Sequence, residues 1–416
     1  MRKTGLAIVA LVVLVAGYLG AQAYSSHVFE RELAHTLDRL RDDEQWQVAR
    51  DRAERGWFLS RGRLRLAPRG DEGWRLSLPY EARHGVLTTR LSGALRLFLS
   101  DGGSNDERML FGDLLDAAEP RWTAAFHTLD RRVEGRLDIA PFEVDVDGER
   151  FALGDAVLDL EGRLGDVRVQ GRVESLRLDG PDAKITAGPL RLESRYRFAD
   201  DGSFFQQRNE LTLERLDFRG SKRQDVTLSG VRYSDETRLD EQLRVDLAIS
   251  LDEAQASGER LLSGNLKARL DRIDGQAARR LVEQVKAILQ EQGGEVTALD
   301  EAQVERIEPA LLSALGDSPR FILEGVTLTS PLFGVDVRGS GELIFDGQDS
   351  QALNLDALLE GDAEPWRERL NGRFSWHGVP PLLALQLGLP PETRQIELRI
   401  EQGRLLVNGQ PLASVR

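Results

Sequence analysis

The sequence predicts a mainly β protein with a helical insertion (α+β), an elongated antiparallel sheet or meander that follows one N-terminal transmembrane helix. Three observations support this fold class. Apolar and polar side chains alternate with a period of two along most of the chain after Trp46. Asp-Gly and Asn-Gly pairs, which suit the tight turns of β-hairpins, recur between these segments. An uncharged apolar run near the N-terminus has the length of a membrane-spanning helix.

Residues 1–23 are predicted to form a membrane anchor. Arg2 and Lys3 precede an uncharged run of twenty residues, 4–23, and a helix of that length spans a hydrocarbon core of about 30 Å. Cations that flank such a run favour the cytoplasmic side. We therefore expect a single-pass protein of the bacterial inner membrane, with its N-terminus in the cytoplasm and its bulk in the periplasm.

A cleaved signal peptide is the alternative interpretation of the same run. Ala21-Gln22-Ala23 has the small-x-small form that a signal peptidase accepts. The uncleaved anchor is preferred because the apolar run extends almost to that point and the next segment continues as a helix.

Residues 24–45 are predicted to form a juxtamembrane helix. Ser26 is a suitable N-cap, and Phe29, Leu33, Leu37 and Leu40 make one apolar stripe at helical spacing. The polar face mixes acidic and basic side chains, so we expect the stripe to pack on the β-domain or to continue the membrane helix rather than to lie in the lipid surface.

Residues 46–273 are predicted to form a periplasmic β-domain, and 318–416 its C-terminal segment. The run Leu243, Val245, Leu247, Ile249 and Leu251 is typical, since every second residue is apolar and charged residues lie between. Each such strand has one apolar face and one charged, solvated face. Asn371-Gly372 and Asn408-Gly409 are among the predicted hairpin turns.

Residues 274–317 are predicted to form a helical hairpin. Asp274 is a suitable cap for a first helix that ends at Gly293-Gly294, and a second helix is expected from Thr297, with Asp300 completing a capping box. Pro309 is expected to kink or divide the second helix. The apolar face of the first helix is predicted to carry Ala277, Leu281, Val282, Val285, Ile288 and Leu289.

Charge and composition narrow the possible partners. The net charge is −14, and beyond Ala23 the chain has 53 basic and 69 acidic residues, a net charge of −16. A domain with this charge binds nucleic acid poorly. The chain contains no cysteine, so it has no disulfide and no thiolate nucleophile, and an oxidising periplasm poses no hazard to it.

No catalytic, cofactor or metal motif is recognisable. The five histidines lack the spacing of a helical metal pair, and the sequence has no nucleophile elbow and no phosphate-binding glycine loop. Asp145, Asp147 and Glu149 alternate with apolar residues, which favours the solvated face of a hairpin over a calcium or acid–base site. We therefore expect a non-enzymatic protein without a cofactor.

Two further short segments each have two interpretations. His84-Gly85 lies between strand patterns; the favoured interpretation is a histidine whose ring bonds a neighbouring carbonyl beside a glycine bend, and the alternative is a polar site residue. Trp57-Phe58 is interpreted as core filling, and the alternative is a ligand anchor.

Four short segments together carry a family resemblance. They are Arg55-Gly56-Trp57-Phe58-Leu59-Ser60, His84-Gly85, Leu270-Asp271-Arg272-Ile273-Asp274-Gly275 and Gly403-Arg404-Leu405-Leu406-Val407-Asn408-Gly409-Gln410. In these segments the chain resembles the YdgA family of uncharacterised, membrane-anchored bacterial proteins. Leu59 and Val86 depart from the serine and proline of the family pattern. The resemblance implies a periplasmic domain on an inner-membrane anchor, gives no catalytic residues, and marks as motif positions Arg55, Gly56, Phe58, Ser60, His84, Gly85, Asn408 and Gly409. The long alternating strands are also similar in style to AsmA-like envelope proteins, in which a twisted sheet forms an apolar groove for lipid.

Two classes of function follow from these patterns. The first is lipid handling or envelope homeostasis, in which the apolar side of the sheet forms a trough for acyl chains. The second is a structural or interaction module, in which the apolar faces pack on each other and the domain binds another envelope protein. An enzyme whose site is assembled from distant loops is the least favoured class, and its residues would be sought near His84.

Overall fold

The computed structural model describes residues 2–42, 46–69, 73–100, 107–146, 148–163, 165–199, 202–220, 225–291 and 300–411, with backbone alone for 2–20, 42, 100, 146, 289 and 290. The chain divides into two compact units, Met1–Leu176 and Arg177–Arg416. The described residues are mainly antiparallel β structure with few helices, which confirms the mainly β (α+β) part of the predicted fold class. The division between the units falls inside the range 46–273 that was predicted as one β segment.

Unit 1 consists of one long helix followed by short strands. Its elements are α1 (Arg2–Asp42), β1 (Trp46–Glu54), β2 (Leu59–Pro68), β3 (Trp74–His84), β4 (Thr88–Ala94), β5 (Arg96–Ser100), β6 (Glu107–Met109), β7 (Arg121–His127), β8 (Arg132–Ile139), β9 (Phe142–Val146), β10 (Glu149–Leu153), β11 (Ala156–Arg163) and β12 (Asp166–Val173).

The strands of unit 1 pair antiparallel, and α1 packs on them. β3 pairs with β2 on one side and with both β4 and β5 on the other, and β4 leads through β7, β8 and β11 to β12. The second half of α1 contacts β1, β3 and β4. Phe29 and Leu33 of the predicted stripe pack with Tyr80, Ala82 and Phe126 in a buried cluster, because the period of the stripe aligns them on one side of the helix.

Unit 2 consists of longer strands with helices inserted between them. Its elements are β13 (Leu176–Asp179, beginning at the boundary), β14 (Ala183–Ala187), β15 (Leu190–Phe198), β16 (Phe205–Gly220), β17 (Asp225–Leu239), β18 (Gln242–Ala256), β19 (Glu259–Asp274), α2 (Gly275–Glu291), α3 (Glu301–Leu315), β20 (Arg320–Ser330), β21 (Val335–Phe345), the 3₁₀ helix η1 (Ser350–Ala352), α4 (Leu355–Leu359), α5 (Glu364–Arg367), β22 (Leu370–His377), α6 (Pro381–Gln386), β23 (Gln395–Glu401), β24 (Arg404–Val407) and β25 (Gln410–Pro411).

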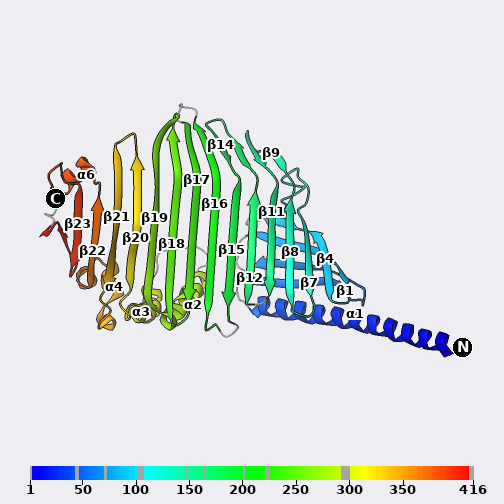
Figure 1. Ribbon diagram of the computed structural model, residues 1–416. Coiled ribbons are helices and arrows are strands. Elements are labelled where there is room, and N and C mark those ends of the chain that lie inside the picture. Colours follow the sequence, from blue (N-terminus) through cyan, green and yellow to red (C-terminus); the bar gives the residue numbers. More distant parts are fainter. Residues whose placement is uncertain are drawn as a thin grey trace. The chain divides into compact units, whose positions relative to one another are not determined.

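From β15 to β25 each strand of unit 2 pairs antiparallel with the next strand along the chain, as the predicted meander requires. Figure 1 shows these strands side by side, with α2, α3 and α4 at one end of them. Such an order follows from hairpins, because a hairpin makes sequence neighbours into sheet neighbours.

The helices of unit 2 begin largely as the sequence predicts. The Asp274 carboxylate accepts a hydrogen bond of 2.6 Å from the Ala277 amide. Asp300 is itself the N-cap of α3, in a capping box with Gln303, rather than the third helical residue; Thr297 and Gly293-Gly294 lie outside the described residues. The division at Pro309 is wrong, since α3 continues through it.

The apolar face predicted for the first of these helices needs correction. Val282 and Val285 are 63% and 39% exposed, whereas Leu281 and Ile288 pack with α3 and Leu355. The stripe that is buried is therefore narrower than the run of apolar residues, because only one line of side chains along α2 meets α3.

The two Asn-Gly pairs have different structures. Asn408-Gly409 forms the predicted two-residue turn: both residues have positive φ, and Val407 pairs with Gln410. Asn371-Gly372 lies inside β22 instead, so the predicted turn there is wrong. A Cβ on Gly372 would lie 2.6 Å from the Glu342 carbonyl oxygen, and glycine is needed at that position for close strand packing.

The described residues contain no helix that combines the length and the apolar character needed to cross a bilayer. The side chains of residues 2–20 fall outside that description, so the anchor over residues 4–23 stays a prediction. Along this stretch the backbone is helical and continuous with the rest of α1.

Candidate functional site

A buried group of polar side chains joins α1 to the strands of unit 1. We call it the helix-docking cluster, and every member is at most 7% exposed. Its members are Gln22, Ser25 and Ser26 from α1, Ser60 from β2, His84 from β3, Thr89 from β4 and Thr128 from the loop after β7. Polar groups at this depth are stable only when they are hydrogen-bonded, so their partners define the contact.

His84 is at the centre of the helix-docking cluster. Its Nε2 lies 2.8 Å from Ser60 Oγ, and its Nδ1 lies 3.0 Å from Thr89 Oγ1. Its backbone carbonyl accepts a hydrogen bond from the side-chain amide of Gln22. Burial lowers the pKa of His84, and the Glu30 carboxylate opposes that shift only partly. The ring is therefore held neutral at pH 7, donating through one nitrogen and accepting through the other.

Two loops of unit 1 and the end of β3 meet the same stretch of α1. Ser26 Oγ donates to the Gly56 carbonyl at 3.1 Å, and Ser25 Oγ lies 2.7 Å from Thr128 Oγ1. The Gly56 amide in turn faces Ser60 Oγ at 3.4 Å. These contacts fix residues 22–26 of the helix between loops that are far apart in the sequence.

An ion pair adjoins the helix-docking cluster one turn further along α1. The Glu30 carboxylate accepts hydrogen bonds of 2.6 and 3.0 Å from Arg50, and Arg55 lies 3.3 Å from it. Arg50 also donates to the Tyr80 hydroxyl at 2.7 Å. Burial acts to raise the pKa of Glu30, but the Arg50 hydrogen bonds and charge outweigh it and lower the pKa overall. The pair is well shielded, because the side chains of Arg50 and Glu30 are 6% and 13% exposed.

The cluster is built to hold a helix rather than to perform catalysis. Ser60 and His84 have the spacing of a nucleophile and its base, but the other ring nitrogen of His84 faces a threonine hydroxyl instead of a carboxylate. Ser60 is 0% and His84 is 3% exposed, so a substrate would first have to displace α1.

The structure brings together most of the predicted motif positions. Arg55, Gly56, Ser60 and His84 all take part in the contacts with α1 described above, and the Gly85 amide donates to the Thr88 carbonyl at 2.9 Å. The expected bond from the His84 ring to a carbonyl is wrong, since the ring bonds two hydroxyls. The prediction that Trp57 and Phe58 fill the core is also wrong, because their side chains are 65% and 52% exposed.

The C-terminal motif positions lie in unit 2. Asn408 and Gly409 form the turn between β24 and β25, and Asn408 Oδ1 accepts a 2.8 Å hydrogen bond from the Glu397 amide. Asparagine suits this turn because it tolerates positive φ while its side chain bonds a neighbouring strand. The role visible here is to complete the edge of the sheet.

One face of the unit 2 sheet is apolar and partly exposed. The strand registers align six apolar residues side by side, each on a different strand, and we call this line the apolar row. Its members, in order, are Leu192, Leu211, Tyr233, Ile249, Leu266 and Val326. Leu192, Tyr233 and Ile249 are 37%, 36% and 42% exposed, which is high for aligned apolar side chains in a sheet.

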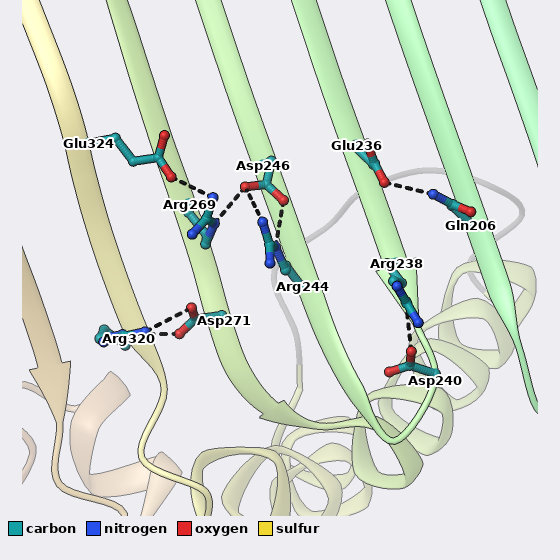
Figure 2. A network of polar contacts seen from close by, with 10 residues as sticks. All are labelled: Gln206, Glu236, Arg238, Asp240, Arg244, Asp246, Arg269, Asp271, Arg320 and Glu324. Atoms are coloured by element: carbon teal, nitrogen blue, oxygen red, sulfur yellow. Dashed lines mark hydrogen bonds and ion pairs between the residues drawn. The ribbon is translucent and has the colours of Figure 1, made fainter.

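The opposite face of the same strands is charged, and Figure 2 shows part of it. Asp246 is bonded to two arginines: Arg244 donates to it at 2.7 and 3.1 Å, and Arg269 donates at 2.6 Å. Arg269 also lies 2.5 Å from Glu324 on β20. Burial acts to raise the pKa of Asp246, but the two arginines lower it overall.

The rest of this face is paired in the same way. Additional contacts in Figure 2 join Gln206 to Glu236, Arg238 to Asp240 and Arg320 to Asp271. Acidic and basic residues alternate along β17 and β18 on this face, although Glu236 lies opposite Asp246 and Arg238 opposite Arg244. The face therefore carries both signs of charge. These ion pairs are exposed to water, and pairs at this exposure stabilise a fold only slightly.

Among the described residues no group of side chains has the composition of a metal site. Asp145 is exposed and lies 3.3 Å from Arg150 across the β9–β10 hairpin, as the solvated interpretation predicts. Asp147 lies outside the described residues.

Sequence reasoning missed Gln22, Ser25, Thr89 and Thr128. A weak signal was present for two of them, because Gln22 and Ser25 are polar and fall three residues apart, on one face of a predicted helix. The partners of Gln22 and Ser25 are more than sixty positions away along the chain, and a local pattern does not reveal such pairs.

The fold and these contacts define a helix-led antiparallel β protein with one charged and one apolar, partly exposed sheet face. The chain belongs to the family described as bacterial protein of unknown function (DUF945), whose model matches residues 1–364. No curated protein and no solved structure matches it.

Proposed function

We propose that this chain is a non-enzymatic protein of the bacterial inner membrane, anchored by residues 4–23 with its bulk in the periplasm, which handles lipid on the apolar face of unit 2. The apolar row is the observation that carries the proposal. Within the family, we also propose that the chain is YdgA-like, on the strength of the four short segments quoted above.

The length of the apolar row suits a hydrocarbon chain. Neighbouring strands lie about 4.8 Å apart, so the five steps from Leu192 to Val326 span about 24 Å. Transfer of each methylene from water to an apolar surface is worth about 0.8 kcal/mol. An acyl chain lying across the strands would cover side chains that are otherwise more than one-third exposed, such as Tyr233 and Ile249.

The two faces of the sheet give the orientation of the lipid. The charged face, with Asp246 bonded to Arg244 and Arg269, would lose hydration if hydrocarbon covered it. The six members of the apolar row carry no charge. Beyond the row, the same face carries Gln207 opposite Thr237 and Asn209 opposite Asp235, and the side chains of the latter pair bond each other at 3.1 Å. We therefore expect the acyl chain on the apolar row and the charged face in water.

The proposal includes that residues 4–23 stay on the chain as an uncleaved anchor. Gln22 is 5% exposed, and its side chain bonds the His84 carbonyl. Cleavage after Ala23 would remove this contact and leave a charged amino group next to buried Ser25. These contacts support an uncleaved helix over a signal peptide.

Lipid extraction and mass spectrometry of the full chain, purified from its native envelope, test the proposal. Ile249→Glu places a carboxylate in the apolar row, and Ser250→Glu, one residue along on the charged face, is the matched control. We expect lipid on the wild type and on Ser250→Glu and a severalfold loss on Ile249→Glu. A lipid-free wild type in repeated preparations would contradict the proposal, as would equal lipid on both variants.

A protein-interaction module is the second candidate, and α6 favours it. Leu382, Leu383 and Leu385 are 69%, 45% and 54% exposed on this short helix, and exposed leucines that cluster are typical of protein contacts. Cross-linking in native membranes distinguishes the two candidates. A single protein cross-linked through α6 in wild type, and lost in Leu382→Ser, would favour the interaction module.

A further inference from the structure

We infer that loops of unit 1 form a membrane-contact collar around α1, at the level where the predicted anchor ends. The collar consists of five large apolar side chains that are exposed to water: Tyr24 at 60%, Trp57 at 65%, Phe58 at 52%, Leu87 at 50% and Leu129 at 76%. Its ligand is the lipid surface itself, in the headgroup and upper acyl region. The inference rests on the proposed membrane anchorage and not on the proposed lipid site of unit 2.

Hydrogen bonds place these side chains around one stretch of helix. The loop with Trp57 and Phe58 accepts a bond from Ser26 through the Gly56 carbonyl. The Phe58 carbonyl in turn accepts from the His84 amide at 2.8 Å.

The remaining two loops are joined in a similar way. The Leu87 carbonyl accepts from the Thr128 amide at 2.9 Å, and Thr128 bonds Ser25 through its side chain at 2.7 Å. Leu129 follows Thr128 directly, and Tyr24 precedes Ser25. Tyr24 thus lies within positions 22–26 of α1, and the other four members lie in loops that contact these positions directly or through one further residue.

The position of the collar along α1 favours a lipid surface as its binding partner. The uncharged run ends at Ala23, and Figure 1 shows α1 continuing past the strands of unit 1 toward the N-terminus. If residues 4–23 span the bilayer, positions 22–26 lie at its periplasmic interface. Tryptophan and tyrosine are enriched at that depth, because their rings are apolar at one end and polar at the other.

Exposed arginines accompany the collar. Arg55, Arg83 and Arg131 have side chains that are 67%, 79% and 61% exposed. Each already pairs with a glutamate, at 3.3, 2.9 and 3.5 Å, so the net charge offered to anionic headgroups is small. We therefore expect apolar insertion, rather than charge, to dominate the contact.

The absence of cysteine from the sequence allows the collar to be mapped residue by residue. Trp57→Cys, Leu87→Cys and Leu129→Cys each carry one environment-sensitive fluorophore, in the full chain reconstituted into phosphatidylethanolamine–phosphatidylglycerol nanodiscs. Leu40→Cys is the control, because it is 38% exposed on the same helix and, sixteen residues after Tyr24, lies about 24 Å further from the bilayer. Quenching is measured with lipids brominated near the headgroup and with lipids brominated near the end of the acyl chain.

We expect severalfold stronger quenching at positions 57, 87 and 129 than at position 40, with lipids brominated near the headgroup more effective than deeply brominated ones. Co-migration of the chain with the nanodiscs, and resistance to alkaline extraction, report on the anchor separately. An anchored chain whose three loop labels are quenched no more than the label at position 40 would overturn the collar and leave the anchor intact. Blue-shifted labels that no brominated lipid quenches would instead identify a protein, such as a second copy, on this surface and also overturn it.

Discussion

At the residue scale, His84 shows how one side chain organises a contact between distant segments. Its two ring nitrogens bond the hydroxyls of Ser60 and Thr89, its carbonyl bonds Gln22, and its ring centroid lies 5.5 Å from that of Phe29. Because the ring is buried and neutral, removal or protonation of it disturbs both strands and helix at once.

His84→Ala is predicted to lower the free energy of unfolding of the full chain in detergent by about 3 kcal/mol, because two buried hydroxyls lose a partner and a cavity forms. Urea denaturation followed by tryptophan fluorescence measures this change. His27→Ala, at an exposed histidine of α1, is the control and should change stability by less than about 0.5 kcal/mol. A loss of equal size in both variants would mean that His84 is not a specific contact.

The stability of the wild type is predicted to fall in mild acid because of the same residue. Burial depresses the pKa of folded His84 below its ordinary value of 6.5, so the unfolded chain takes up the proton first. Stability is therefore full above pH 6.5 and decreases as the pH is lowered from there toward the folded pKa. Urea midpoints across this range should drop in wild type and stay flat in His84→Gln.

Glu30 acts in a separate and lower window. The pKa of its carboxyl is held below 4.5, so its contribution is complete above pH 4.5 and is lost as the pH falls below that value. A wild-type midpoint that stays constant down to pH 4.5 would contradict the role given to His84.

At the element scale, the sheet of unit 2 depends on glycines that let aromatic rings lie flat on its apolar face. Gly339 on β21 pairs with Trp376 on β22, and a Cβ at position 339 would lie 2.4 Å from the indole ring. The neighbouring pair Gly341 and Phe374 repeats this arrangement, again at 2.4 Å. Glycine weakens a strand, but here it makes room for the aromatic ring that covers it.

Gly339→Ala is therefore predicted to destabilise the fold by about 1–3 kcal/mol, because the indole of Trp376 must move. Gly325→Ala on β20 is the matched control: a Cβ there meets no atom within 4 Å, so the change should stay within about 1 kcal/mol. Thermal unfolding monitored by near-ultraviolet circular dichroism compares them. An equal loss in the two variants would show that strand propensity, and not the ring, sets the cost.

At the scale of the whole molecule, α1 connects the predicted membrane segment to the β structure of unit 1 without an interruption in the helix. Its second half is fixed by the helix-docking cluster and by the apolar contacts of Phe29 and Leu33. Because one continuous helix joins the predicted anchor to the strands, the anchor would set the height of unit 1 above a bilayer. The proposed periplasmic location can be tested on the same chain.

Leu332→Cys gives a unique thiol, because the sequence has no cysteine and Leu332 is 52% exposed between β20 and β21. A membrane-impermeant maleimide is predicted to label it in spheroplasts with an intact inner membrane, since the bulk of the chain is expected on the periplasmic side. The cysteine-free wild type corrects for background. Labelling that requires lysis of the spheroplasts would contradict the proposed topology.

Local patterns predicted much of the fold, because they depend on neighbours in the sequence. Alternation with a period of two puts Leu243, Val245 and Leu247 on one side of a strand whatever surrounds it. The cap at Asp274 likewise uses a side chain three residues from the amide that it accepts from. The positions of hairpins were less certain, since the same Asn-Gly pair turns the chain at Asn408 and stays extended at Asn371.

The candidate site was predicted only in part, for the opposite reason. Ser60 and His84 were singled out by resemblance, but Gln22, Thr89 and Thr128, which complete the contact, were not. Trp57 and Phe58 were expected in the core because large aromatics are usually buried. Their exposure depends on what the rest of the chain places over them, and that information is not local.

The sequence alone determined that this chain is mainly antiparallel β structure with a charged and an apolar side, since strand periodicity and turn chemistry act between near neighbours. Tertiary structure decided which segments hold α1, where aromatic side chains are exposed, and how far water reaches the apolar row. Those features depend on burial, and burial is set by residues brought together from distant parts of the chain.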